Sequence, residues 1–122
     1  MKKTNTFTLV EIMIVVAIIG LLAAIAVPSL IKAREKSRVN TCIGNLRQIN
    51  SAKESWAMDQ GKSDGDAVAA DGSELVDYFQ NKTLPTCPLD ATKAWTASYT
   101  PGNIGTAATC IPGAAKGHVL GN

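Results

Sequence analysis

The stretch FTLVEIMIVVAIIGLLAAIAVPS, residues 7–29, decides the fold and is almost entirely apolar. Glu11 is the only charged residue in it. From Ile12 to Ile31 about 20 residues carry no charge, and an α-helix of that length covers ~30 Å, the hydrocarbon thickness of a bilayer. A soluble core helix rarely needs apolar side chains on every side. The stretch therefore predicts a membrane-spanning helix over residues 7–31.

A cleavable secretory signal peptide is the alternative explanation for this apolar run. Its core would be shorter and would be followed by a small-x-small site, a requirement that Ala24-Ile25-Ala26 meets. The mature chain would then begin near Val27. It would be a secreted or membrane-tethered small binding domain or enzyme.

Glu11 lies at the edge of the apolar run. A carboxylate carried to the centre of a bilayer costs ~2.5–3.5 kcal/mol on insertion scales. At the headgroup interface the cost is small. The residues alone leave both interpretations open, a functional charge within the membrane or an ordinary interfacial residue.

The segment from Phe7 to Ser29, with the short basic leader MKKTNT before it, resembles the class III signal and N-terminal helix of type IV pilins and type II secretion pseudopilins. The resemblance rests on the leader, an aromatic residue, Glu11 at the fifth position counted from that aromatic, and Pro28 later in the run. It implies an α+β, pilin-like fold. A long N-terminal α-helix, with a membrane-spanning half and an amphipathic half, packs against a small C-terminal head with a short antiparallel β-sheet.

The resemblance also implies how the N-terminus is processed. In that family a membrane prepilin peptidase removes the leader, here at the Thr6–Phe7 bond, and the new amine, here on Phe7, is methylated. The family's leader normally ends in Gly, occasionally Ala. Because Thr6 is β-branched and bulkier, we expect slower cleavage or a peptidase with a wider pocket.

Glu11 matches the family glutamate that is thought to pair with the N-terminal amine of a neighbouring subunit. An unpaired carboxylate in a low-dielectric helix bundle is costly, and a neighbour's ammonium group cancels it. Only one axial stagger brings the two charges together. Glu11 is therefore expected to set the register of assembly.

The function implied is that of a filament subunit, of a type IV pilus or of a type II secretion pseudopilus, and not an enzyme. The implied partners are further copies of the chain in a helical filament, prepilin peptidase, an inner-membrane assembly platform with its ATPase, and membrane lipid before assembly. No catalytic residue, cofactor or metal is expected. The expected location is the bacterial inner membrane, as a single-pass protein with a periplasmic head, and then a periplasmic or extracellular filament.

Charge gives weaker guidance than the motif. The net charge of +2 provides no general case for nucleic acid. The basic group at residues 32–38 fits anionic lipid headgroups, and a DNA contact is a weaker interpretation because no aromatic residues are interleaved. Counting Lys and Arg on the two sides of the apolar run weakly favours a cytoplasmic head. We follow the more specific family motif.

The chain divides by pattern into a leader (1–6), an assembly helix (7–31), its amphipathic continuation (32–60) and a small head (61–122). An apolar stripe at three- and four-residue spacing marks the continuation and predicts the seam on which the head packs. The stripe consists of Val39, Cys42, Ile43, Leu46, Ile49, Ala52 and Trp56.

The head is predicted to hold a short helix and a small sheet. A helix is expected at Ser73–Asn81, and alternation predicts a strand ending at Thr100 that begins at Trp95. Ile104–Cys110 is its expected antiparallel partner, and Val119-Leu120 a possible edge strand. Four aspartates could suggest calcium, but their spacing matches no regular calcium loop. They are Asp59, Asp64, Asp66 and Asp71.

The chain has three cysteines and one histidine. Cys87 and Cys110 bracket the expected hairpin, and a disulfide between them would contribute ~3 kcal/mol on the chain-entropy view. Cys42 lies on the helix stripe and is expected to be buried and reduced. Two reduced thiols, or Cys42 paired with either partner, remain alternatives. With no CxxC and His118 as the sole histidine, zinc is not expected.

Overall fold

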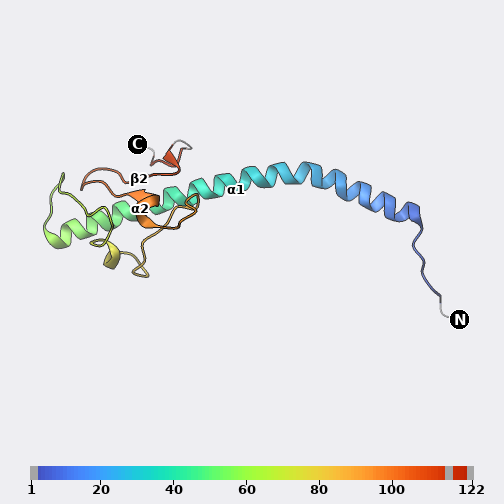
Figure 1. Ribbon diagram of the computed structural model, residues 1–122, viewed down its shortest axis with the longest axis horizontal. Helices are drawn as coiled ribbons and strands as arrows, with labels where there is room; N and C mark the ends of the chain where they lie inside the picture. Colours follow the sequence, from blue (N-terminus) through green and yellow to red (C-terminus); the bar gives the residue numbers. More distant parts are fainter. Residues whose placement is uncertain (1–2, 115–116, 121–122) are drawn as a thin grey trace. The chain divides into compact units, whose positions relative to one another are not determined.

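The computed structural model describes residues 3–114 and 117–120. Its elements follow the order α1 (Leu9–Gln60), η1 (Val76–Tyr78), α2 (Trp95–Ser98), β1 (Tyr99–Thr100) and β2 (Thr109–Cys110) (Figure 1). The chain forms two compact units, and α1 contributes residues to both. We call them the N-terminal unit (Met1–Glu35) and the head unit (Lys36–Asn122). A long helix with a small two-stranded antiparallel sheet is the predicted α+β, pilin-like layout.

The N-terminal unit is a single stretch of α-helix preceded by a non-helical leader. The helix begins at Leu9 and continues without a break through Pro28, although proline removes one backbone donor. Its first part is long and apolar enough to cross a membrane, and no residue of its most apolar window is buried. The structure thus agrees with the predicted spanning helix in length and composition, with a start two residues later than Phe7.

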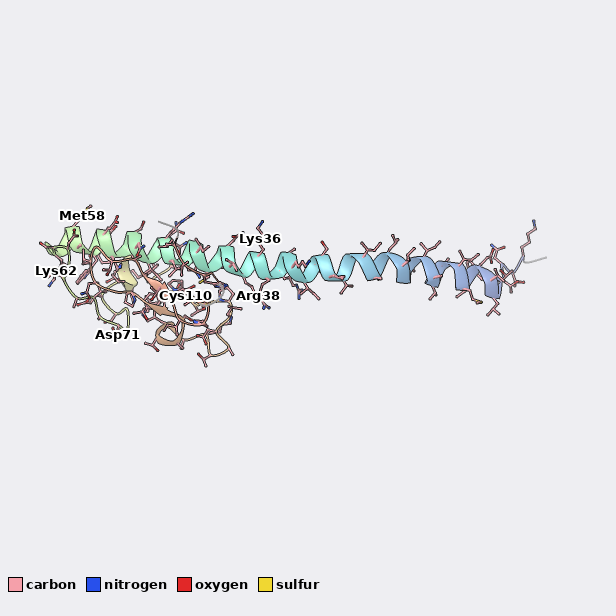
Figure 2. The ribbon with its side chains drawn as sticks, turned by 90° about the horizontal axis from the view of Figure 1, so that it is seen from above. Lys36, Arg38, Met58, Lys62, Asp71 and Cys110 are labelled. Atoms are coloured by element: carbon pink, nitrogen blue, oxygen red, sulfur yellow. The ribbon has the colours of Figure 1, made fainter. Side chains whose placement is uncertain are left out.

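In the head unit one face of α1 is buried beneath the rest of the chain. The segments after Gln60 run alongside this part of the helix (Figure 1). Met58 points away from them, and Cys110 lies among them (Figure 2). The predicted stripe is confirmed at its centre, because α1 buries Cys42, Leu46, Ile49, Ala52, Lys53, Trp56 and Ala57. Val39 and Ile43 are only half-buried.

The predicted strand over residues 95–100 is wrong for its first four residues, which form α2. The cause is Asp90, whose carboxylate accepts hydrogen bonds from the backbone N–H of Thr92 and Ala94 and from the Ser98 hydroxyl. These bonds wind the segment into a turn. Only Tyr99 and its neighbour remain extended.

The strand partner is confirmed, although it is shorter than expected. β1 and β2 pair antiparallel with Tyr99 opposite Cys110 and Thr100 opposite Thr109. The expected edge strand at Val119-Leu120 is wrong, because neither residue is in a strand. Tyr99 also ends a row of three buried aromatic rings. The ring centroids of Tyr99 and Trp95 are 5.8 Å apart, and those of Trp95 and Phe79 are 6.4 Å apart.

The helix expected at Ser73–Asn81 shrinks to the short 3₁₀-helix η1. Backbone hydrogen bonds between residues three apart define the segment. The Leu75 N–H donates to the Gly72 carbonyl, and the Tyr78 N–H donates to the Leu75 carbonyl. Asp71 accepts bonds from the Ser73 N–H and hydroxyl, which favours this tight winding over a regular α-helical start.

Candidate functional site

The start of α1 carries a reciprocal capping box. The Thr8 N–H donates to Glu11 Oε2 at 2.8 Å, and the Glu11 N–H donates to Thr8 Oγ1 at 3.3 Å. Together these bonds satisfy two backbone donors that a helix start leaves free. Sequence reasoning singled out Glu11 but missed Thr8, although the Thr-x-x-Glu spacing is the recognised signal for this arrangement.

The expected processing bond lies just before this cap. Thr6 and Phe7 are outside the helix, and the Phe7 residue is 80% exposed. A peptidase binds its substrate in an extended form, so the Thr6–Phe7 bond is accessible without unwinding α1. Neither cleavage nor methylation is visible in a single chain, and both stay predictions.

The N-terminal unit exposes large apolar side chains on every side of α1. Ile12, Leu21 and Ile25, for example, are all more than half exposed. Isolated exposed apolar residues are normal, but a continuous surface of this extent marks a membrane or protein contact. This surface and the Glu11 cap together form the first candidate site.

A second candidate site lies inside the head unit, where three thiols and an imidazole meet. Cys42, Cys87, Cys110 and His118 are all buried, and their ligand-type atoms lie within 4.8 Å of one another. The Cys87 sulfur is 3.4 Å from that of Cys110 and 4.0 Å from that of Cys42. The residues come from four separate places in the chain: α1, the loop before α2, β2, and the C-terminal segment.

A hydrogen-bond donor lies near each of two of these sulfurs. The Tyr99 hydroxyl, which accepts a bond from Asn45 Nδ2 at 2.9 Å, faces Cys42, and the Gly113 N–H faces Cys110. Burial raises the pKa of the thiols of Cys42 and Cys110, because an apolar surrounding disfavours a lone thiolate. Burial also raises the pKa of the Tyr99 phenol.

The absence of zinc was predicted from the missing CxxC motif and the single histidine, but residues that are far apart in sequence meet in the fold. No CxxC is needed when Cys42, on the helix, meets two cysteines and a histidine from distant segments. Cys42 is buried, as expected. Cys87 and Cys110 are free thiols in this structure and lie close together. Their pairing as a disulfide stays a prediction.

Lys53 is a further buried group that the sequence pattern did not reveal. It is 3% exposed, and its Nζ donates to the carbonyls of Pro101, Asn103 and Thr106. Burial lowers the pKa of this ammonium group. The side chain ties α1 to the loop between β1 and β2, which is a structural role.

Three of the four aspartates considered for calcium have separate hydrogen-bond partners. Asp59 accepts a hydrogen bond from the Tyr78 hydroxyl, Asp66 from the Ser63 N–H, and Asp71 from Ser73. Among the described residues, the group with metal-binding potential is the cysteine–histidine cluster.

Comparison with known proteins points to the N-terminal segment. The family model described as the prokaryotic N-terminal methylation motif matches residues 1–27. The chain is 46% identical over 54 residues to the type IV major pilin protein PilA of Myxococcus xanthus, which covers 44% of this chain and 24% of that one.

Two further relatives represent both kinds of filament system. The type II secretion system core protein G of Pseudomonas aeruginosa is 34% identical over 58 residues, covering 48% of this chain and 41% of that protein. A fimbrial protein of Pseudomonas aeruginosa is 44% identical over 84 residues, covering 69% and 54%. The chain therefore spans between 24% and 54% of the length of these three relatives. The search of solved structures found no significant match to the chain.

Proposed function

We propose that this chain, a member of the type IV pilin and type II secretion pseudopilin family, is a structural subunit of a type IV pilus-like or type II secretion pseudopilus filament. The observation that carries the proposal is the start of α1, where a wholly exposed apolar helix begins with a single capped carboxylate, Glu11. Its relatives are named as pilin, fimbrial and secretion core proteins, which supports a structural role and not a catalytic one.

In this proposal the apolar surface of α1 has two successive environments. Before assembly it lies in the inner membrane, where lipid chains cover it. In the filament the same side chains pack against the helices of other subunits. Since apolar residues on all sides of a helix suit both surroundings, one sequence serves both states.

Processing at the Thr6–Phe7 bond would create the amine on which assembly depends. Cleavage by a prepilin peptidase releases the basic leader and leaves the amine of Phe7, later methylated, next to the cap. Thr6 in place of a smaller residue predicts slow cleavage. The non-helical chain at this bond supports access by the peptidase.

Glu11 would then align each subunit with its neighbour. In the single chain Glu11 Oε2 accepts the Thr8 N–H, which fixes the direction of the side chain. A carboxylate has about four acceptor positions, so it can also receive the ammonium group of a neighbouring Phe7. In the low dielectric of a helix bundle this pairing occurs at one axial stagger only.

The remaining elements of the proposal concern location and machinery. The head would face the periplasm. An inner-membrane platform and its ATPase would extract the subunit into a filament that stays in the periplasm or extends outside. The matches to pilins and to a secretion core protein support both filament types equally. Deletion of the gene separates them, since loss of surface pili indicates a pilus and loss of secretion indicates a pseudopilus.

The decisive experiment is mass spectrometry of the mature N-terminus together with a Glu11 variant. We expect a chain that starts at methylated Phe7. We also expect Glu11→Ala to insert in the membrane at the normal level but to yield no filaments. Glu54→Ala removes an exposed carboxylate from the head unit and should leave the filament yield unchanged. A mature chain starting near Val27 would indicate a conventional signal peptide and a small secreted domain, and normal filaments from Glu11→Ala would refute the register role.

A further inference from the structure

The cysteine–histidine cluster of the head unit has no role in the filament function proposed above. Three sulfurs and an imidazole, all buried, lie within 4.8 Å of one another. Three thiolates and one histidine form a common ligand set of structural zinc sites. We propose that Cys42, Cys87, Cys110 and His118 bind one Zn²⁺ ion.

The spacing of the ligand atoms fits one tetrahedral ion. With Zn–S bonds of about 2.3 Å, the sulfurs of a tetrahedral site lie about 3.8 Å apart. The separations of the Cys87 sulfur from those of Cys110 and Cys42, 3.4 and 4.0 Å, fall on either side of this value. The four ligand atoms lie within 4.8 Å of one another, a separation compatible with coordination of a single ion.

The imidazole supplies an independent observation. His118 is fully buried, and neither Nδ1 nor Nε2 has a hydrogen-bond partner in the part of the chain that the structure describes. A buried polar atom without a partner costs free energy, so its position requires an explanation. A metal–nitrogen bond would supply a partner for one of the two ring nitrogens, since a neutral imidazole binds zinc through one nitrogen.

The backbone around the histidine is shaped to admit the ring. A Cβ atom on Gly113 would lie 2.3 Å from Cγ and Nδ1 of His118, which no side chain tolerates. The His118 N–H donates to the Gly113 carbonyl at 3.1 Å, and the Gly113 N–H faces the Cys110 sulfur. Gly113 thus both leaves room for the imidazole and fixes the backbone of His118.

Polar groups beside the sulfurs form a second layer around the site. Asn45 donates to the Tyr99 hydroxyl, which faces Cys42. Such outer contacts orient ligands and disperse the charge of thiolates on a metal. Binding releases the three thiol protons to solvent, so the site carries one net negative charge, and no open coordination position is left for catalysis.

Zinc is favoured over other metals by the ligand types. Thiolate and imidazole are softer than the oxygen ligands that calcium and magnesium require. A closed tetrahedral site also suits the size of the head, because a small domain with few core residues commonly depends on a metal or a disulfide. The ion would join α1, β2, the loop before α2 and the C-terminal segment in one cross-link.

The zinc site and the Cys87–Cys110 disulfide exclude each other. A disulfide consumes two of the three thiolates, and the remaining pair, Cys42 and His118, is too few for a structural site. The oxidised chain is therefore the competing state, and the two states differ in metal content and in the number of free thiols.

The test begins with the full-length chain, purified in detergent under reducing and then non-reducing conditions. We expect one zinc per chain by elemental mass spectrometry, and three thiols that become alkylated only after denaturation with a chelator. Replacement of zinc by Co²⁺ should give the visible absorption of a tetrahedral thiolate site. Removal of zinc should lower Tm, and Zn²⁺ should restore it whereas Ca²⁺ should not.

Ligand variants separate a metal site from a merely buried histidine. His118→Ala should weaken zinc binding at least 100-fold, since even changes outside the ligand set cost 10–100-fold. His118→Cys keeps a four-ligand site and should retain one zinc per chain. Gly113→Ala alters no ligand but displaces the ring, and it should lose the ion. Ile104→Val, a mild change elsewhere in the buried core, is the control and should keep the ion.

Two results would overturn the proposal. The first is a chain without zinc in which Cys87 and Cys110 are joined and only Cys42 can be alkylated. The second is equal zinc content in the wild type and in folded His118→Ala, with circular dichroism confirming the fold. Neither result bears on the filament proposal, which rests on Glu11 and the mature N-terminus.

Discussion

The two ends of α1 have the same backbone geometry but are stabilised in opposite ways. In the N-terminal unit large apolar residues such as Leu22 are exposed, at 61%. In the head unit Leu46 has the same side chain and is fully buried. The chain itself covers the second part, whereas only other molecules can cover the first. A matched substitution in each part can therefore separate folding from assembly.

The largest expected effect on folding is that of Leu46→Ala. Truncating a fully buried leucine removes its apolar contacts and leaves a cavity, at a cost of about 2–5 kcal/mol. Denaturant unfolding of the full-length chain in detergent, followed by the fluorescence of its two tryptophans, measures this loss, because Trp56 and Trp95 both lie in the head unit.

Leu22→Ala is the matched control for the same substitution. It should leave the free energy of unfolding of the head within about 0.5 kcal/mol of the wild type, yet reduce filament yield. If Leu22→Ala destabilised the head as much as Leu46→Ala, the division into separately stabilised parts would be wrong.

Lys53→Met is expected to have the next largest effect. Methionine keeps the length of the apolar stem but removes the ammonium group, and three carbonyls, of which that of Pro101 accepts a fully buried bond, then lose a donor. Leaving buried acceptors unpaired costs about 1–3 kcal/mol, again measured by unfolding in detergent. Lys36→Met removes an exposed charge and should change the free energy by less than about 0.5 kcal/mol. If both variants changed the free energy of unfolding equally, Lys53 would not stabilise the contact between α1 and the β1–β2 loop.

The carboxyl group of Asp90 should make the stability of the head depend on pH. Hydrogen bonds, chiefly from the Thr92 hydroxyl, lower the pKa of its carboxyl group. Because the unfolded chain takes up the proton at higher pH than the folded one, this contribution is complete above about pH 4 and is lost as the pH falls through the folded value.

Unfolding measured at several pH values between about 2 and 5 tests this contribution. Asp90→Asn should flatten the dependence, and Thr92→Val, which removes the first of the donors, should flatten it in part. A wild-type slope retained in Asp90→Asn would assign the acid sensitivity to other groups.

Local pattern was sufficient to predict the N-terminal unit. Apolar residues on all sides from Ile12 onward, one carboxylate and a basic leader specify a helix that needs no contact with the rest of its chain. The central stripe of the head unit was equally readable, since Leu46 and Ile49 recur at helical spacing. These features depend on residues close together in sequence.

The features that were missed depend on residues far apart. Alternation between apolar and polar residues favoured a strand at Trp95, but the Asp90 carboxylate winds that segment into α2. Lys53 has the composition of a surface residue and is buried because carbonyls about 50 residues away surround it. No spacing rule connects Cys42 with His118. Only the packing of the head onto α1 brings them together.

The smallest expected effect is at the start of α1, where Thr8 and Glu11 cap each other. Thr8→Val keeps the shape of the side chain but removes the acceptor of the Glu11 N–H. Loss of an N-cap costs typically about 1 kcal/mol, which corresponds to about fivefold faster hydrogen exchange of the amides in the first turn.

Hydrogen exchange of the full-length chain in detergent, read by mass spectrometry at residues 9–12, measures this change. Thr8→Ser retains an acceptor and should exchange at the wild-type rate, and head unfolding should be the same in both variants. Because the cap also fixes the direction of the Glu11 carboxylate, Thr8→Val should lower filament yield only modestly, whereas Glu11→Ala should abolish it. Equal first-turn exchange in Thr8→Val and Thr8→Ser would show that membrane or detergent contacts, and not the capping box, hold Glu11 in place before a neighbour's amine reaches it.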